Sequence, residues 1–277
     1  MNHEGTKGRG TVDSTAVAEE VPSGGALIRG AHENFAEAYR LIARALPTGL
    51  IESWPDAEVC AAGGAEGEFN RVYVFDEPAD AAALIERARA LFARVGVAWT
   101  LVASREAHAA LGRVTFAHGL AAGESLPGML RGADGIVEGD AAGLEIEEVS
   151  SAALAEIFVA TLAAGFRAAR EPLAILAAPG VWDAPGARSF IGWMEGEAVG
   201  TATCVTTGDI AGIYNVSTRR AWLRKGVGRA MTRAAGAYGE AEGGRYLSLQ
   251  ATPAGFPLYE TMGFRTTAMY RLWHSFR

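Results

Sequence analysis

The sequence has 277 residues, 49% of them hydrophobic and 21% charged, which is enough for two modest domains that each bury a core. Its formal net charge is -7, and its basic residues form no stripe outside one stretch at 218–229, so we expect no general binding of nucleic acid. No apolar run approaches the roughly 20 residues that span a bilayer, so we expect no membrane segment.

Residues 1–27 are rich in Gly, Ser, Thr and Glu and lack the apolar core of a secretory signal, which predicts a disordered tail. The two cysteines, Cys60 and Cys204, fall in predicted strands far apart in the sequence. This arrangement indicates neither a disulfide framework nor a metal site, and no histidine pattern accompanies Cys204 as a nucleophile. We therefore expect a cytoplasmic protein that uses no metal.

The spacing of apolar residues divides residues 28–131 into helices and strands. We expect helices at 33–46, 79–95 and 106–113. Strands are expected at 57–62, 70–75, 97–103 and 119–130. Four glycines with aspartates between them then predict an interdomain linker over 132–143.

The second half begins with a strand at 144–149 and a helix whose N-cap is Ser150 or Ser151. A mixed stretch at 165–183 follows, with a short helix after Pro172. Further strands are expected at 189–194, 198–206, 210–218, 245–251 and 266–273. The turns between the first three of these are too short for parallel neighbours, so they must form an antiparallel meander. Helices are expected at 227–238 and 256–262.

A basic turn with two glycines joins the strand at 210–218 to the helix that follows. The first turn of a helix leaves backbone N–H groups unpaired, the helix dipole adds positive charge, and glycines let the preceding amides converge. Residues 224–229, Arg-Lys-Gly-Val-Gly-Arg, therefore suit a cradle for pyrophosphate. The alternative is an ordinary turn with solvated basic side chains. A GxGxxG fingerprint would need glycine at Met231, and no P-loop ending occurs.

Two motifs resemble those of the GNAT superfamily of N-acyltransferases. Residues 225–230, Lys-Gly-Val-Gly-Arg-Ala, are similar to its acyl-CoA motif, Arg/Gln-x-x-Gly-x-Gly/Ala, with Leu223 at the Arg/Gln position and Arg224 one place later. Residues 258–264, Leu-Tyr-Glu-Thr-Met-Gly-Phe, are close to its second signature, Leu-Tyr-Glu-x-x-Gly-Phe. The resemblance covers residues 144–277, whose expected order β-α-α-β-β-β-α-β-α-β is that of the family fold.

The resemblance implies an N-acetyltransferase with acetyl-CoA as acyl donor and a small amine-bearing molecule as acceptor. Tyr259 takes the position of the family's general acid, which protonates the leaving thiolate. The strand ending at Thr218 is implied to offer backbone groups of Val216 and Thr218 to the donor. The implied pyrophosphate contacts are Arg224, Lys225, Gly226, Val227, Gly228 and Arg229.

No general base emerges from the sequence. Family members often carry a glutamate on the strand at 210–218, but the nearby positions Gly212, Tyr214 and Val216 offer none. The remaining candidates, which no spacing supports, are Asp209, Glu171 and Asp183. A non-catalytic acyl-CoA-binding sensor or interaction module is therefore the alternative to an enzyme.

The acceptor is left open among aminoglycosides, amino-acid derivatives, small thiol precursors and protein N-termini. We expect the stretch at 165–183, which contains Trp182, and surfaces of the first half to select it. The protein is expected to be a monomer or a homodimer.

The two halves align at one constant offset, which places residues 99–104 on 247–252 and Phe116 on Phe264. Under this offset the cradle residues Lys225, Gly226 and Gly228 fall on Glu77, Pro78 and Asp80. Carboxylates at a helix N-terminus stabilise the helix and repel pyrophosphate. We therefore predict an α/β (α+β) protein of two GNAT-like domains, each a mixed, mostly antiparallel twisted sheet flanked by helices. The domain at 28–131 is expected to be degenerate and the one at 144–277 active, with one CoA per chain.

Overall fold

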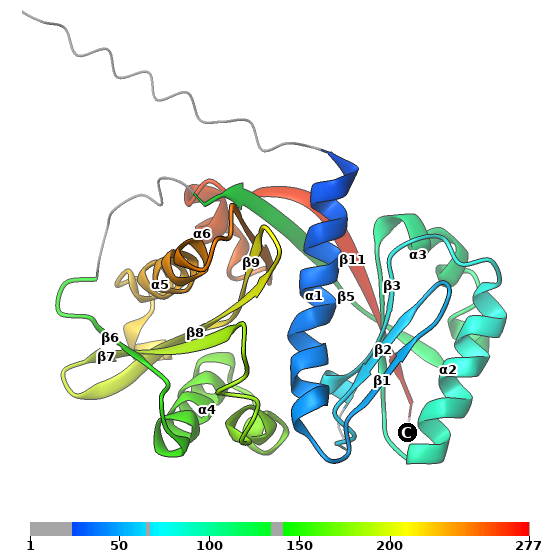
Figure 1. The fold of residues 1–277 in the computed structure, drawn as a ribbon, viewed down its shortest axis with the longest axis horizontal. Helices are drawn as coiled ribbons and strands as arrows, with labels where there is room; N and C mark the ends of the chain where they lie inside the picture. Colours follow the sequence, from blue (N-terminus) through cyan, green and yellow to red (C-terminus); the bar gives the residue numbers. More distant parts are fainter. Residues whose placement is uncertain (1–23, 65–66, 134–140, 277) are drawn as a thin grey trace, which may run out of the picture.

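The computed structural model describes residues 24–64, 67–133 and 141–276 (Figure 1). The α-helices of the first half are α1 (Gly25–Ala45), α2 (Ala81–Val95) and α3 (Arg105–Gly112). The strands of this half are β1 (Leu50–Ser53), β2 (Glu58–Ala61), β3 (Asn70–Val74), β4 (Thr100–Ala103) and β5 (Leu120–Gly132). Short 3-10 helices lie at η1 (Gly67–Phe69) and η2 (Phe116–His118).

The second half repeats this alternation. Its strands are β6 (Glu145–Glu148), β7 (Ala187–Met194), β8 (Glu197–Thr207), β9 (Ile210–Thr218), β10 (Tyr246–Gln250) and β11 (Arg265–Ser275). Its helices are α4 (Ala152–Phe166), η3 (Glu171–Ala177), η4 (Arg220–Trp222), α5 (Val227–Ala241) and α6 (Phe256–Thr261). The described part of the chain contains no helix long and apolar enough to cross a membrane.

Local chemistry sets several helix ends. The Asp80 carboxylate accepts a hydrogen bond from the Ala83 N–H at 3.0 Å and caps α2, and Gly96 with φ 73° ends it in the left-handed conformation. Ser151 caps α4 by accepting from the Leu154 N–H at 3.3 Å. These caps allow short helices to begin and end at defined residues.

All strands of the described chain belong to one sheet of 11 strands, ordered β1-β2-β3-β4-β11-β5-β10-β9-β8-β7-β6. The last strand of each half lies beside strands of the other half. Strand β5 pairs with β10, and β11 pairs with β4, while β5 and β11 pair antiparallel with each other at the centre. Each half therefore completes the sheet of the other.

Helices cover both faces of this sheet. Side chains alternate along β8, so that Ala202 and Cys204 pack in the core under α5, whereas Thr203 and Val205 face α1. Helix α1 lies across the middle of the molecule and contacts β1 and β2 of the first half and β8 and β9 of the second (Figure 1). This single helix bridges the two halves.

The predicted elements of both halves are present, with two departures. Helix α1 begins at Gly25 rather than at residue 33, and no side chain caps it, so no capping signal marks its start. Strand β1 was not predicted because the Pro-Thr-Gly segment before it reads as a turn. Most of the predicted tail and residues 134–140 of the predicted linker lie outside the described residues. The mixed α/β class with a mostly antiparallel sheet is confirmed, and the sheets of the two halves are continuous.

Candidate active site

Strand β9 separates from β10 beyond Gly212. The parallel pairing covers only residues 210–212 of β9 and 246–248 of β10, whereas β9 remains paired with β8 as far as Thr218. The register with β8 shifts in the separated part, and Asn215 there has φ 53°. The shift is a β-bulge, which leaves an extra residue out of the ladder and re-aims backbone groups. A gap with available backbone amides therefore opens between β9 and β10.

The N-terminus of α5 lies just after this gap. Gly226, with φ 84°, is the N-cap residue, and no side chain caps the helix. Arg224 also adopts the left-handed region, with φ 61°, which for a non-glycine residue costs about 1 kcal/mol or more. Residues 223–226 are exposed. The first-turn amides of α5 are thus presented at an open surface, as an anion site requires.

Helices α5 and α6 meet the end of β9 at Gly228. A Cβ atom built on Gly228 would lie 3.3 Å from Leu258 Cδ2 and 3.5 Å from Thr218 Oγ1, so the junction is closely packed and a side chain longer than a methyl group would displace its neighbours. Arg229 Nη2 donates to Thr261 Oγ1 at 2.9 Å and ties α5 to α6. The predicted cradle, the strand end and the second motif therefore converge in space.

The remaining predicted cradle residues have different settings. Lys225 Nζ stacks on the ring of buried Trp222 at 4.2 Å, which fixes its charge beside the loop. Val227, the first residue of α5, is buried in the core cluster, and Val216 packs against the same cluster. Arg224 remains exposed at the loop. The solvent-exposed side of the predicted cradle therefore carries the positive charge, and its inner side makes apolar contacts with the core.

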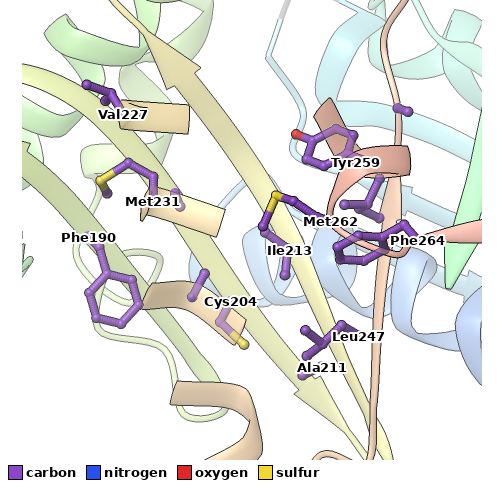
Figure 2. Close-up of a cluster of buried hydrophobic side chains, with 14 of the residues drawn as sticks. Phe190, Cys204, Ala211, Ile213, Val227, Met231, Leu247, Tyr259, Met262 and Phe264 are labelled. Atoms are coloured by element: carbon purple, nitrogen blue, oxygen red, sulfur yellow. The ribbon is translucent and has the colours of Figure 1, made fainter. Parts of the chain in front are cut away.

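Tyr259 lies with Met262 and Phe264 on one side of the core cluster, opposite Val227 and Met231 of α5 (Figure 2). Burial raises the pKa of its phenol to about 12, and a hydrogen bond with Thr232 opposes this rise. Thr232 Oγ1 donates to the Gly228 carbonyl at 2.8 Å, so it accepts from the phenol. Tyr259 is therefore protonated at neutral pH and is linked through one hydroxyl to the first turn of α5.

A cavity lies on the face of the sheet opposite α5, among α1, α4, η3 and strands β7 to β9. Its enclosed volume is about 70 Å³, and about 590 Å³ of empty space lies in it when its open mouth is included. From β9 it is lined by Tyr214 and Asn215, the residues at the bulge. Among the described residues that line it, none has a carboxylate or a basic side chain. The cavity therefore reaches the sheet where β9 has left β10.

Comparison with known proteins agrees with this geometry. Residues 153–264 match the family model described as acetyltransferase (GNAT) family. Residues 153–264 therefore form a GNAT domain. No curated protein matches the chain. The match supports acyl transfer as the class of reaction.

Solved structures extend the likeness beyond the GNAT domain to most of the chain. A GCN5-related N-acetyltransferase from Kribbella flavida is similar at TM-score 0.67 and 18% identity, covering 89% of this chain and 95% of its own. A tandem GNAT protein from the clavulanic acid biosynthesis pathway is similar at TM-score 0.53 and 14% identity, with the same coverage of both chains. A putative GNAT acetyltransferase from Novosphingobium aromaticivorans is similar at TM-score 0.52 and 17% identity, covering 82% and 92%. At these identities the likeness establishes the fold.

The GNAT domain places none of the three candidate bases in the cavity wall. Asp209 lies before β9, at the opposite end of that strand from the bulge, and Glu171 and Asp183 are not among the lining residues. Burial raises the pKa of the Cys204 thiol to about 12, so it is not a thiolate nucleophile at neutral pH. No group of three or more metal-ligating side chains occurs in the described part of the chain.

The first half lacks both features of the GNAT domain's gap. Strand β3 pairs with β4 from Arg71 to Val74, so the two strands do not separate. The N-terminus of α2 is occupied by the Asp80 carboxylate. The expected structural role of Asp80 is therefore confirmed.

Several residues at the site gave no signal in the sequence. Thr232 and Trp222 support Tyr259 and Lys225, and they were not singled out because threonine and tryptophan fit many positions. Asn215 at the bulge was missed as well, although Asn is among the residues that tolerate a positive φ. Of the residues expected to select the acceptor, Trp182 lines the cavity, whereas Arg170 forms an ion pair with Glu156.

Proposed function

We propose that this protein transfers an acetyl group from acetyl-CoA to a primary amine of a small acceptor. The observation that carries the proposal is the gap between β9 and β10, which opens onto the uncapped N-terminus of α5. The residues fit the donor in shape and charge. Gly228 lets α5 approach α6 and the end of β9 closely, and the basic loop at 223–226 faces solvent, where a pyrophosphate would be bound.

When bound, acetyl-CoA supplies a thioester whose carbonyl carbon accepts the amine and whose sulfur departs. The backbone of Val216 and Thr218 would contact the donor in the gap, and residues 224–229 would hold its pyrophosphate. An N–H donor aimed at the developing oxyanion typically contributes on the order of 3 kcal/mol to lowering the barrier. Tyr259, held protonated by burial, would give its proton to the departing sulfur.

Calorimetric titration with acetyl-CoA tests the proposal. We expect one binding site per chain, because the first half has paired strands and a capped helix in the equivalent place. The variant Gly228→Glu should abolish binding by putting a carboxylate and its side chain into the junction. Ala237→Glu, which adds the same charge at an exposed position of α5, is the matched control and should bind normally. Absence of binding to the unmodified protein would overturn the proposal.

A non-catalytic acyl-CoA-binding module is the second candidate, favoured by the absence of a base among the described residues of the cavity wall. It predicts the same calorimetric result without turnover of any amine. Release of free thiol from acetyl-CoA in the presence of acceptor amines separates the two functions.

A further inference from the structure

The cavity beside the β9 bulge has mostly apolar walls. Helix α1 contributes Tyr39 and Ile42, α4 contributes Phe158, and the segment after η3 contributes Val181 and Trp182. A charged group placed among such side chains loses its hydration without gaining an ionic partner, which is strongly unfavourable. The walls therefore favour a ligand whose part inside the cavity is uncharged and either apolar or aromatic.

The polar side chains of the wall are mostly engaged with protein partners. The pairs are Ser189 with Thr203 at 2.9 Å, Asn215 with Thr203 at 3.2 Å and Tyr214 with Asn34 at 2.6 Å. Trp182 differs, because its indole Nε1 is buried and has no hydrogen-bond partner among the described residues. A buried N–H without a partner is costly and suits an oxygen atom supplied by a ligand.

Charged residues next to the lining residues are engaged elsewhere. They form the pairs Arg71 with Glu68 at 2.8 Å, Arg40 with Glu58 at 2.6 Å and Arg188 with Glu148 at 3.0 Å. Asp183 accepts a hydrogen bond from the Gly180 N–H at 2.6 Å. The Arg71 guanidinium also stacks on the Tyr39 ring at 4.0 Å, which puts a positive charge behind this wall and disfavours an ammonium ion. Burial raises the pKa of both wall phenols, Tyr39 and Tyr214, which are therefore neutral.

We propose that this cavity takes an acceptor whose primary amine is carried on an uncharged apolar or aromatic body with one hydrogen-bond-accepting oxygen, and that it excludes polycations and zwitterions. The proposal rests on the acetyltransferase function and names the substrate class of that site. Arylalkylamines have this chemistry. Aminoglycosides and free amino acids do not.

This chemistry also explains how the reaction proceeds without a protein base. An alkyl ammonium has a pKa near about 10.4 in water, and an apolar cavity admits the small neutral fraction. The neutral nitrogen attacks the thioester carbon, the carbon–sulfur bond breaks, and the departing thiolate takes a proton from Tyr259. The amide nitrogen releases its extra proton to water, and Tyr259 is protonated again. The protein thus contributes to the reaction by excluding charged amines from the cavity and by holding Tyr259 as the acid.

Binding of defined amines to the full-length protein with CoA present tests the class directly. The probes are phenethylamine, 4-methoxyphenethylamine, spermidine and kanamycin, titrated by calorimetry. Phenethylamine should bind, and the methoxy compound should bind about tenfold more tightly because its oxygen accepts from the Trp182 N–H. Tighter binding of spermidine or kanamycin than of phenethylamine would overturn the proposal.

Two tryptophan variants test the hydrogen bond. Trp182→Phe keeps an aromatic wall and should remove the tenfold advantage of the methoxy compound while phenethylamine still binds. Trp193→Phe is the matched control, since its buried indole nitrogen also lacks a partner among the described residues but does not line the cavity. An advantage that survives in Trp182→Phe would refute the assignment of the oxygen to this wall.

The pH dependence of kcat/KM gives an independent readout. For phenethylamine and its less basic difluorinated analogue, kcat/KM should rise with pH and level off at the pKa of each amine. If kcat/KM levelled off at the same pH for both amines, the titrating group would be a base of the protein, and the proposal would be contradicted. Failure of the acceptor class and failure of the acetyltransferase function give different results. Acetylation of kanamycin with no binding of phenethylamine overturns the acceptor class alone. Binding of phenethylamine without any binding of acetyl-CoA overturns the acetyltransferase function alone.

Discussion

Tyr259 is the residue on which the proposed chemistry depends most directly. The variant Tyr259→Phe keeps the ring that packs edge to face on Phe264 at 5.8 Å and removes only the hydroxyl. General acids contribute about 10²–10⁴-fold, so we expect a loss of acyl transfer of that size with unchanged affinity for acetyl-CoA. Because the phenol's pKa is about 12, the activity should show no alkaline fall from this group below about pH 11.

The control for this prediction is Tyr246→Phe. Tyr246 lies on β10, where its ring contacts Arg245, away from α6. Steady-state kinetics and calorimetry on both variants decide the assignment. If Tyr259→Phe turned over acetyl-CoA as fast as the unmodified protein, Tyr259 would have only a packing role.

His32 on α1 should make stability depend on pH. Burial lowers the pKa of His32 from 6.5 to about 4, opposed by the charges of Glu106 and Asp76. The ring stacks on Phe75 at 4.5 Å and meets Tyr270 edge-on. The unfolded chain therefore binds a proton between pH 6.5 and pH 4 that the folded chain does not, so stability present above pH 6.5 is lost as pH falls through this window.

We expect the loss to be about 3 kcal/mol, from roughly 1.4 kcal/mol per pKa unit. Urea unfolding at pH 7.5 and pH 4.5 measures most of this loss, about 2.5 kcal/mol, and His32→Phe, which keeps the stacking, should lose about 2.5 kcal/mol less than the unmodified protein. Equal losses in the two proteins would show that His32 does not titrate differently on folding.

At the scale of elements, the bulge of β9 depends on a backbone conformation that few residues adopt. Asn215 has φ 53°, which a β-branched residue adopts only with strain of about 1–3 kcal/mol. Asn215→Val should therefore lower the free energy of unfolding by that amount and reduce acyl transfer by displacing the bulge. Asn215→Gly loses the same side-chain contacts without the strain and should be the more stable variant. Chemical denaturation compares the two, and equal stabilities would count against a strained bulge.

Most elements could be predicted because their signals are local. Apolar periodicity marks α2 and the meander of β7, β8 and β9, and the Asp80 and Ser151 caps mark helix starts. The cradle was predictable for the same reason, since the glycines and basic residues at 224–229 are contiguous. Strand β1 has only four residues, of which alternate ones are only half-buried, so its periodicity is too short to recognise.

The cavity, by contrast, could not be predicted from the sequence. Its walls combine Tyr39 on α1, Trp182 after η3 and Asn215 on β9, which only the tertiary structure brings together. The separation of β9 from β10 is equally hidden, because the periodicity of β9 continues unchanged through Gly212. Sequence periodicity reports which face of a strand is buried, and not which neighbour the strand keeps.

At the scale of the whole molecule, the exchange of β5 and β11 places parts of each half in the core of the other. Trp273 and Leu272 of β11 are buried in clusters formed mainly by the first half, and Met129 of β5 is buried in the core under α5. Nothing local in β5 or β11 encodes this choice, since both are long strands that follow a short helix in equivalent places of the two halves. The boundaries predicted at 28–131 and 144–277 remain a prediction for the domains.

The exchange predicts that the two halves do not fold separately. A fragment of residues 144–277 would expose the edge of β10 that pairs with β5 and would leave Trp273 without its core. We expect this fragment alone to lack cooperative unfolding, and mixing it with residues 24–133 to restore the fold and the binding of acetyl-CoA. The intact chain should unfold in one transition by both calorimetry and tryptophan fluorescence. A fragment that unfolds cooperatively near the melting temperature of the intact chain would show that the central strand pairing contributes little to stability.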